Sequence, residues 1–145
     1  MQTLIFVIMF GLLGGFAVGL QGPLASLMSQ RLGILESVFI IHLGGAIVAL
    51  SPLLLMEGGN LSHWRTVPWY ALGAGALGLV VLGAVSITIP RIGAASTIIL
   101  IVAGQLLIGA ILDHFGLLGI AARPIDLSRL AGMLVVFAGI WLMVR

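Results

Sequence analysis

Long apolar stretches separated by short polar ones dominate the chain. Charged residues, prolines and Asn60 divide its 145 residues into five apolar segments, each near the length of about 20 residues that a helix needs to cross a bilayer. The segments cover residues 4–28, 34–56, 67–89, 92–112 and 127–144, approximately. Their apolar runs are continuous rather than alternating, which favours helices over membrane strands. The pattern predicts an all-α integral membrane protein, a bundle of five transmembrane helices in a single domain over residues 1–145.

Two of the interruptions are informative. Gln21-Gly22-Pro23 falls inside the first segment and predicts a polar kink, because proline frees a backbone carbonyl and bends the helix. Residues 115–122 are apolar but too short to cross a membrane, so they either extend the fourth helix or form an interfacial turn.

Composition supports the bilayer as the solvent. Hydrophobic residues make up 61% of the chain and charged residues 7%, and the mean hydropathy is +1.33. Six separated arginines against four acids cannot form a nucleic-acid footprint. The chain has no cysteine, no clustered metal ligands and no phosphate loop, so the expectation is a non-enzyme without a cofactor.

The arginines give no preferred orientation. Five crossings place Arg65, Arg123 and Arg129 on the amino-terminal side and Arg31, Arg91 and Arg145 on the other. Because the positive-inside rule counts these residues, three against three supplies no bias. Such a chain could insert in both directions and form an antiparallel dimer; the alternative is one orientation fixed by other features.

A glycine stripe marks the first helix. Gly11, Gly15 and Gly19 repeat every four residues and allow another helix to approach closely. The stripe predicts either ordinary helix packing or a dimer contact.

Three polar side chains lie deep in apolar segments: Gln21, His42 and Gln105. Polar groups in hydrocarbon are costly without a partner or a wet cavity, so all three are candidate substrate-binding residues around a common central cavity. The alternatives are a neutral His42 bonded to a nearby carbonyl and a Gln105 that bonds a neighbouring helix.

Four ionisable residues near helix ends are candidates for gating or coupling: Glu36, Arg91, Asp113 and His114. For Glu36, a solvated carboxylate at the positive end of the helix dipole is the structural alternative. For Asp113 and His114, it is hydrogen bonding at the membrane interface.

Several motifs together resemble the YdcZ-type family, a short five-helix branch of the drug/metabolite transporter superfamily. They are Gly14-Gly15 with the run Gly19 to Leu24, the turn Pro90 to Ala95, the run Gly104-Gln105-Leu106, and the segment Asp113 to Gly119. The likeness covers essentially the whole chain. Its most specific part is Asp113-His114-Phe115-Gly116.

The resemblance implies a transporter. Larger members of the superfamily have ten helices in two inverted halves, so this chain is similar to one half that pairs with a second copy or a close relative. Alternating access with the substrate near the midplane is the expected mechanism. The chain departs from the family pattern at Ala25, where Asn is expected, and at His42, where an apolar residue is expected. It also resembles the small multidrug resistance proteins, which carry a glutamate inside the first helix. The first helix here has no acid, so this resemblance does not imply proton coupling through that residue.

The sequence therefore predicts a multi-pass protein of a bacterial inner membrane that moves a small organic solute, drug or metabolite. Its expected partners are membrane lipid, the solute and a homodimeric or paralogous second subunit. The alternatives are a non-transporting scaffold or accessory subunit and a lipid-handling protein.

Overall fold

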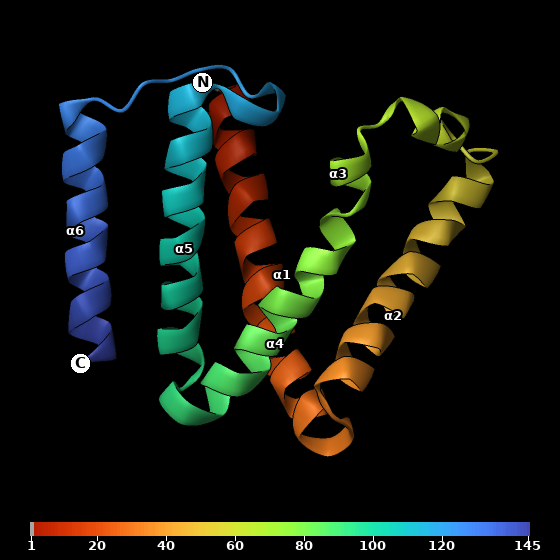
Figure 1. Cartoon of the computed structure of the whole chain (residues 1–145), viewed down its shortest axis with the longest axis horizontal. Helices are drawn as coiled ribbons and strands as arrows, with labels where there is room; N and C mark the ends of the chain where they lie inside the picture. Colours follow the sequence, from red (N-terminus) through yellow and green to blue (C-terminus); the bar gives the residue numbers. More distant parts are fainter. Residues whose placement is uncertain (1) are drawn as a thin grey trace. The chain divides into compact units, whose positions relative to one another are not determined.

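Helices form almost the whole of the protein. The computed structural model describes residues 2–145, within which there is no strand. The helices are α1 (Gln2–Leu32), α2 (Ile34–Leu55), α3 (Trp69–Leu72), α4 (Ala74–Ile92), α5 (Ala94–Phe115) and α6 (Leu127–Val144), with short 3-10 helices at Leu61–Thr66 and Leu117–Gly119 (Figure 1).

Within residues 2–145, five helical spans are long and apolar enough to cross a membrane, which confirms the prediction of five transmembrane helices. The third span, Trp69–Ile92, consists of α3 and α4 with an irregular residue at Gly73 between them. Pro23 lies inside α1, which continues to Leu32 beyond the predicted end near residue 28. Likewise α5 continues past Asp113 to Phe115.

Contacts divide the chain into two compact parts, residues 1–90 and residues 91–145. In the first part α1 and α2 contact each other near the turn at Gly33, whose φ of 111° an L side chain rarely adopts, and diverge from it (Figure 1). The helix α4 reaches both of them: a methyl group added at Gly22 of α1 would lie 3.5 Å from Val85 Cγ1, and one added at Gly83 of α4 would lie 3.8 Å from Ile34 Cγ2 of α2.

The second part is a hairpin of α5 and α6. The helix α5 ends at Gly116, which takes the left-handed conformation with φ 63° and ψ 36°. The connection then folds back on α5, where the Arg123 N–H donates to the Asp113 carbonyl at 2.6 Å. Asp126 begins α6 as its N-cap, accepting from the Arg129 N–H at 2.7 Å.

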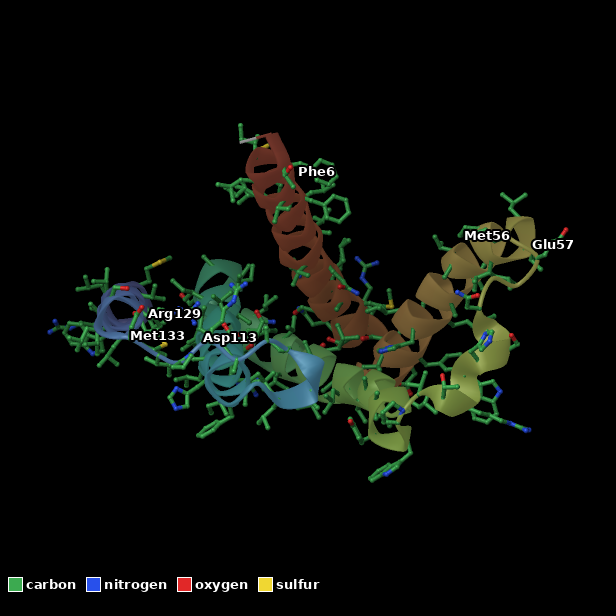
Figure 2. All side chains as sticks on the ribbon, turned by 90° about the horizontal axis from the view of Figure 1, so that it is seen from above. Phe6, Met56, Glu57, Asp113, Arg129 and Met133 are labelled. Carbon is green, nitrogen blue, oxygen red and sulfur yellow. The ribbon has the colours of Figure 1, made fainter. Side chains whose placement is uncertain are left out.

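Apolar side chains project outward along all the helices, as Figure 2 shows. Among the described residues the buried hydrophobic side chains are Ala25, Leu82, Val85, Ala103 and Ile140. This distribution is typical of helices whose solvent is lipid, where burial of apolar surface inside the protein brings no hydrophobic gain.

Candidate functional site

A groove of about 330 Å³ runs between α5 and α6 in the part formed by residues 91–145. It is lined by Gln105, Leu106, Gly109, Ala110, Asp113, Ile125, Arg129 and Met133. Most of these side chains are apolar, and the polar ones lie at two levels.

The first level is in the middle of the membrane span. Gln105 is one of the two central residues of the 22-residue helix α5, so it lies half-way along this candidate membrane span. Its side chain is exposed and lines the groove. An amide offers both donors and an acceptor to a ligand, without charge.

The second level is near the C-terminal end of α5. Asp113 follows Gln105 by eight residues, about 12 Å along the same side of α5. Arg129 and Met133, one turn apart on α6, lie opposite, and Figure 2 shows Asp113, Arg129 and Met133 gathered there. The Arg129 Nη1 lies 3.6 Å from Asp113 Oδ2. The groove therefore has an ion pair at its outer end and an amide half-way down.

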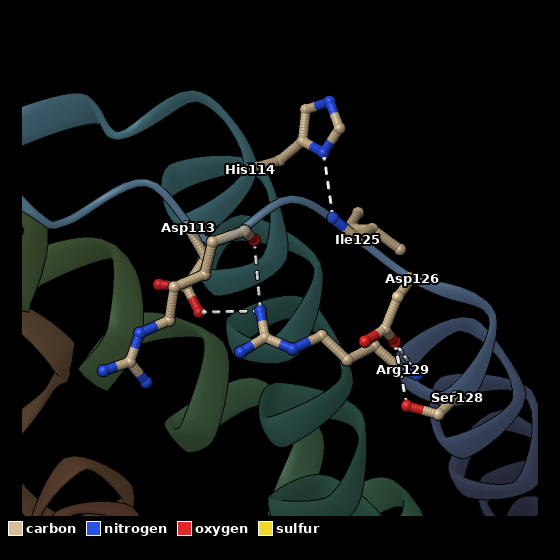
Figure 3. A network of polar contacts seen from close by, with 7 residues as sticks. Asp113, His114, Ile125, Asp126, Ser128 and Arg129 are labelled. Carbon is tan, nitrogen blue, oxygen red and sulfur yellow. Dashed lines mark hydrogen bonds and ion pairs between the residues drawn. The ribbon is translucent and has the colours of Figure 1, made fainter.

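The same guanidinium also fixes the connection between the helices. Arg129 Nη1 donates to the Arg123 carbonyl at 3.1 Å. Figure 3 shows Arg129 together with Asp113 in this network of polar contacts. The two side chains of the ion pair remain 39% and 37% exposed, so solvent and headgroups screen their attraction. The pair consequently contributes little to the stability of the fold.

Asp126 and His114 hold the neighbouring backbone. Two donors, the Arg129 N–H first and then the Ser128 hydroxyl, lower the pKa of the Asp126 carboxyl from its ordinary value. His114 Nδ1 accepts the Ile125 N–H at 3.1 Å, and its ring meets Phe115 edge-on at 4.7 Å between centroids. These contacts favour the structural interpretation of His114, while Asp113 lines the groove itself.

His42 belongs to a different groove, of about 310 Å³, in the part formed by residues 1–90. Its Nδ1 lies 2.8 Å from the Val38 carbonyl, and because that oxygen only accepts, Nδ1 carries the proton. The other ring nitrogen, Nε2, faces Gly78 of α4, and a side chain at that position would collide with the imidazole. The expected bond to a nearby carbonyl is thus present.

The remaining predicted residues do not line the α5–α6 groove. Gln21 is exposed on α1 beside the buried Gly22. The Glu36 carboxylate lies over Gly33 in the first turn of α2, as expected for a carboxylate at the helix N-terminus. Arg91 is exposed in the last turn of α4.

The glycine stripe of α1 does not contribute to close packing within the described chain. A methyl group added at any of its members would meet no atom within 4 Å; these are Gly11, Gly15 and Gly19. The stripe is therefore available to a helix from another molecule, while the prediction of a dimer contact remains to be tested.

Arg129 was not predicted as a site residue; it entered the sequence analysis only as one of the arginines counted for orientation. The signal was present, because an acid ending one helix and a basic residue in the first turn of the next face each other in an antiparallel hairpin. Within residues 2–145 no group of three or more His, Asp and Glu side chains could hold a metal ion.

Comparison with known proteins decides the family. Residues 6–142 match the YdcZ family of proposed inner membrane exporters in the drug/metabolite transporter class. The chain belongs to the YdcZ family. No curated protein and no solved structure matches it. Membership confirms the resemblance read from the motifs and makes this YdcZ-family chain a multi-pass membrane protein of transporter type.

Proposed function

We propose that this YdcZ-family protein exports a small organic solute by alternating access and that the solute binds in the groove between α5 and α6. The observation that carries the proposal is the groove's length: it extends from Gln105 at the centre of α5 to the Asp113–Arg129 pair at the interface. Inverted-repeat transporters hold their substrates near that depth.

Each part of the groove has a role in the proposal. The apolar walls accommodate the hydrophobic body of a solute, and Gln105 orients its polar end by hydrogen bonding. The Asp113–Arg129 pair closes the outer end, and separating its charges opens the groove. The proposal also includes Gln21 and His42, which would face the same central cavity in the assembled protein. Within one chain, His42 lines a groove of its own.

Export of a fluorescent organic cation such as ethidium from proteoliposomes tests the groove. Gln105→Leu is expected to lower the export rate about tenfold, the loss of about one hydrogen bond to a ligand, while leaving the thermal unfolding temperature unchanged. Leu107→Ala is the matched control, since Leu107 is on the same turn and does not line the groove.

The parallel change His42→Leu tests the common cavity. If Gln105 instead hydrogen-bonds a neighbouring helix, the unfolding temperature of Gln105→Leu will fall together with its export rate. Undiminished export in both Gln105→Leu and His42→Leu would rule out the central cavity.

We also propose an antiparallel homodimer that supplies ten helices, with the glycine stripe of α1 at or near its contact. Three observations support it: equal arginine counts on both faces, the open stripe, and a chain of half the helix number of larger relatives. The alternative assembly is a heterodimer, in which a close paralogue replaces the second copy.

Orientation labelling tests the dimer. The chain has no cysteine, so Gly59→Cys provides a single label in the loop after α2. Dual insertion predicts that an impermeant reagent labels about half of the molecules from either side, because each orientation exposes the loop on one face. Labelling from one side alone would contradict the antiparallel form.

Lipid handling is the second candidate function. A groove of about 410 Å³ with almost wholly apolar walls lies between the N-terminal half of α5 and the C-terminal end of α6. Its walls are Leu100, Phe137, Ile140, Trp141 and Val144, with Arg145 at the end. Scrambling of labelled phospholipid in the same proteoliposomes, without ethidium export, would favour this function.

A further inference from the structure

The connection between α2 and α3 contains a short 3-10 helix, Leu61–Thr66. It joins two spans that are long and apolar enough to cross a membrane, Ile34–Leu55 and Trp69–Ile92 (Figure 1). Because consecutive membrane spans are connected at a bilayer face, the ends of this helix are held close to the lipid headgroups. All residues from 61 to 70 are exposed in the chain.

The spacing of apolar residues matches the period of this helix. A 3-10 helix has about three residues per turn, so positions three apart lie on one face. Leu61 and Trp64 are on one such line, and it continues to Val67, which directly follows the helix as its C-cap. The positions between them are all polar: Ser62, His63, Arg65 and Thr66. The helix is therefore amphipathic, with an apolar stripe formed by Leu61, Trp64 and Val67.

The apolar stripe has no cover within the described chain. Leu61 is 59% exposed, Trp64 54% and Val67 40%. An amphipathic helix at a membrane lies in the plane of the interface, with its apolar side at the boundary of the acyl chains and its polar side among the headgroups. The stripe fits that placement, because the two membrane spans already hold its ends at the bilayer face.

Arg65 places a positive charge beside the stripe. Its Cζ lies 5.5 Å from the centroid of the Trp64 ring, a cation–π contact. Among the described residues no carboxylate forms an ion pair with Arg65. The nearest acid in the sequence is Glu57, in the turn that precedes the helix. The guanidinium is therefore exposed next to the indole, where it can reach a headgroup phosphate.

Two more aromatic side chains follow at the start of the third span. Trp69 is 84% exposed, and its ring meets that of Tyr70 edge-on at 6.1 Å between centroids. Tryptophan and tyrosine concentrate at the headgroup level of membranes, because their rings are apolar and their tips are polar. These two residues extend the exposed surface of the 3-10 helix to the beginning of α3.

We propose that residues 61–70 form a surface that binds anionic phospholipid, with the apolar stripe at the acyl boundary and the Arg65 guanidinium on the lipid phosphate. A guanidinium pairs well with a phosphate, and a basic residue at the surface attracts lipids of net negative charge. In phosphatidylcholine the choline group offsets the phosphate charge, so that lipid is held less strongly. The surface shares no residue with the α5–α6 groove and does not depend on the proposed export.

Fluorescence quenching of Trp64 tests this surface in the full-length protein. The chain has three tryptophans, so Trp69→Phe combined with Trp141→Phe leaves Trp64 as the single fluorophore. This protein is reconstituted in equimolar phosphatidylglycerol and phosphatidylcholine, with bromine on the acyl chains of one lipid at a time. We expect both brominated lipids to quench Trp64, with phosphatidylglycerol preferred about fivefold, the effect of one arginine at an anionic surface.

Substitutions in the same single-tryptophan protein separate charge from position. Arg65→Gln should abolish the preference for phosphatidylglycerol, and Arg65→Lys should keep it, because both basic side chains attract the anionic lipid. Arg123→Gln is the matched control, a lost arginine in another connection. Exchanging neighbours by Trp64→Arg with Arg65→Trp keeps the composition but moves the indole off the apolar stripe, so quenching by lipid should fall about twofold and quenching by aqueous acrylamide should rise.

The proposal is overturned if acrylamide quenches Trp64 and brominated lipid does not, because the surface would then face water or another protein. Equal quenching by the two brominated lipids would also overturn it, since the segment would be an anchor without selectivity for anionic lipid. A preference for phosphatidylglycerol that persists in Arg65→Gln would do the same. None of these results involves transport, so each leaves the proposed export untouched.

Discussion

Replacing Asp113 by Asn is expected to lower ethidium export by roughly tenfold or more while leaving the unfolding temperature close to the parent value. The amide has the size of the carboxylate but not its charge, so the attraction to Arg129 at 3.6 Å is lost. Because both side chains are more than a third exposed, the pair contributes little to folding. Its role at the entrance of the groove is what the substitution removes.

The measurement pairs export with thermal unfolding for Asp113→Asn, Arg129→Gln and the double variant. If the two charges act as one gate, the double variant will be no worse than either single change, since residues that share one interaction are not additive. Asp126→Asn is the control, because Asp126 caps α6 without lining the groove. Export at the parental rate in Asp113→Asn would remove the ion pair from the transport path.

The five spans were predictable because the bilayer fixes their length and composition. Helix starts were predicted best: α2 begins directly after Gly33, and α6 begins after Asp126, whose side chain caps it. Helix ends were predicted less well. The polar residues Gln30 and Arg31 indicated that the first helix had already ended, but α1 continues to Leu32. Long polar side chains can reach the headgroups while their backbone remains helical.

The site was predictable in part. Gln105 was a candidate because it is polar inside an apolar segment, and Asp113 because it is ionisable at a helix end; both line the α5–α6 groove. The positions of Asp113 and Arg129 at facing helix ends hinted at their contact, but its geometry depends on how residues 116–126 fold back over the end of α5. A repeated turn could also have been found in the sequence, because Arg31-Leu32-Gly33 and Arg91-Ile92-Gly93, 60 residues apart, are near-identical.

The fold-back after α5 depends on one glycine, and Gly116→Val is expected to destabilise the protein by at least about 2 kcal/mol. Gly116 has φ 63°, which a β-branched residue adopts only with strain. A Cβ there would also lie 3.1 Å from Ala122 Cβ and 3.3 Å from the Ile120 carbonyl oxygen, both in the connection that carries the chain to α6. The substitution therefore forces the connection away from α5 and disrupts the bond from the Arg123 N–H to the Asp113 carbonyl.

Unfolding in detergent measures this effect, with Gly132→Ala as the control. Gly132 is inside α6, and a methyl group there would meet no atom within 4 Å, so the change should be neutral or stabilise by up to about 1 kcal/mol. Because α6 supplies Arg129 and Met133 to the groove, Gly116→Val should lower export along with stability. Equal unfolding temperatures for Gly116→Val and Gly132→Ala would show that the left-handed residue does not set the path of the chain between α5 and α6.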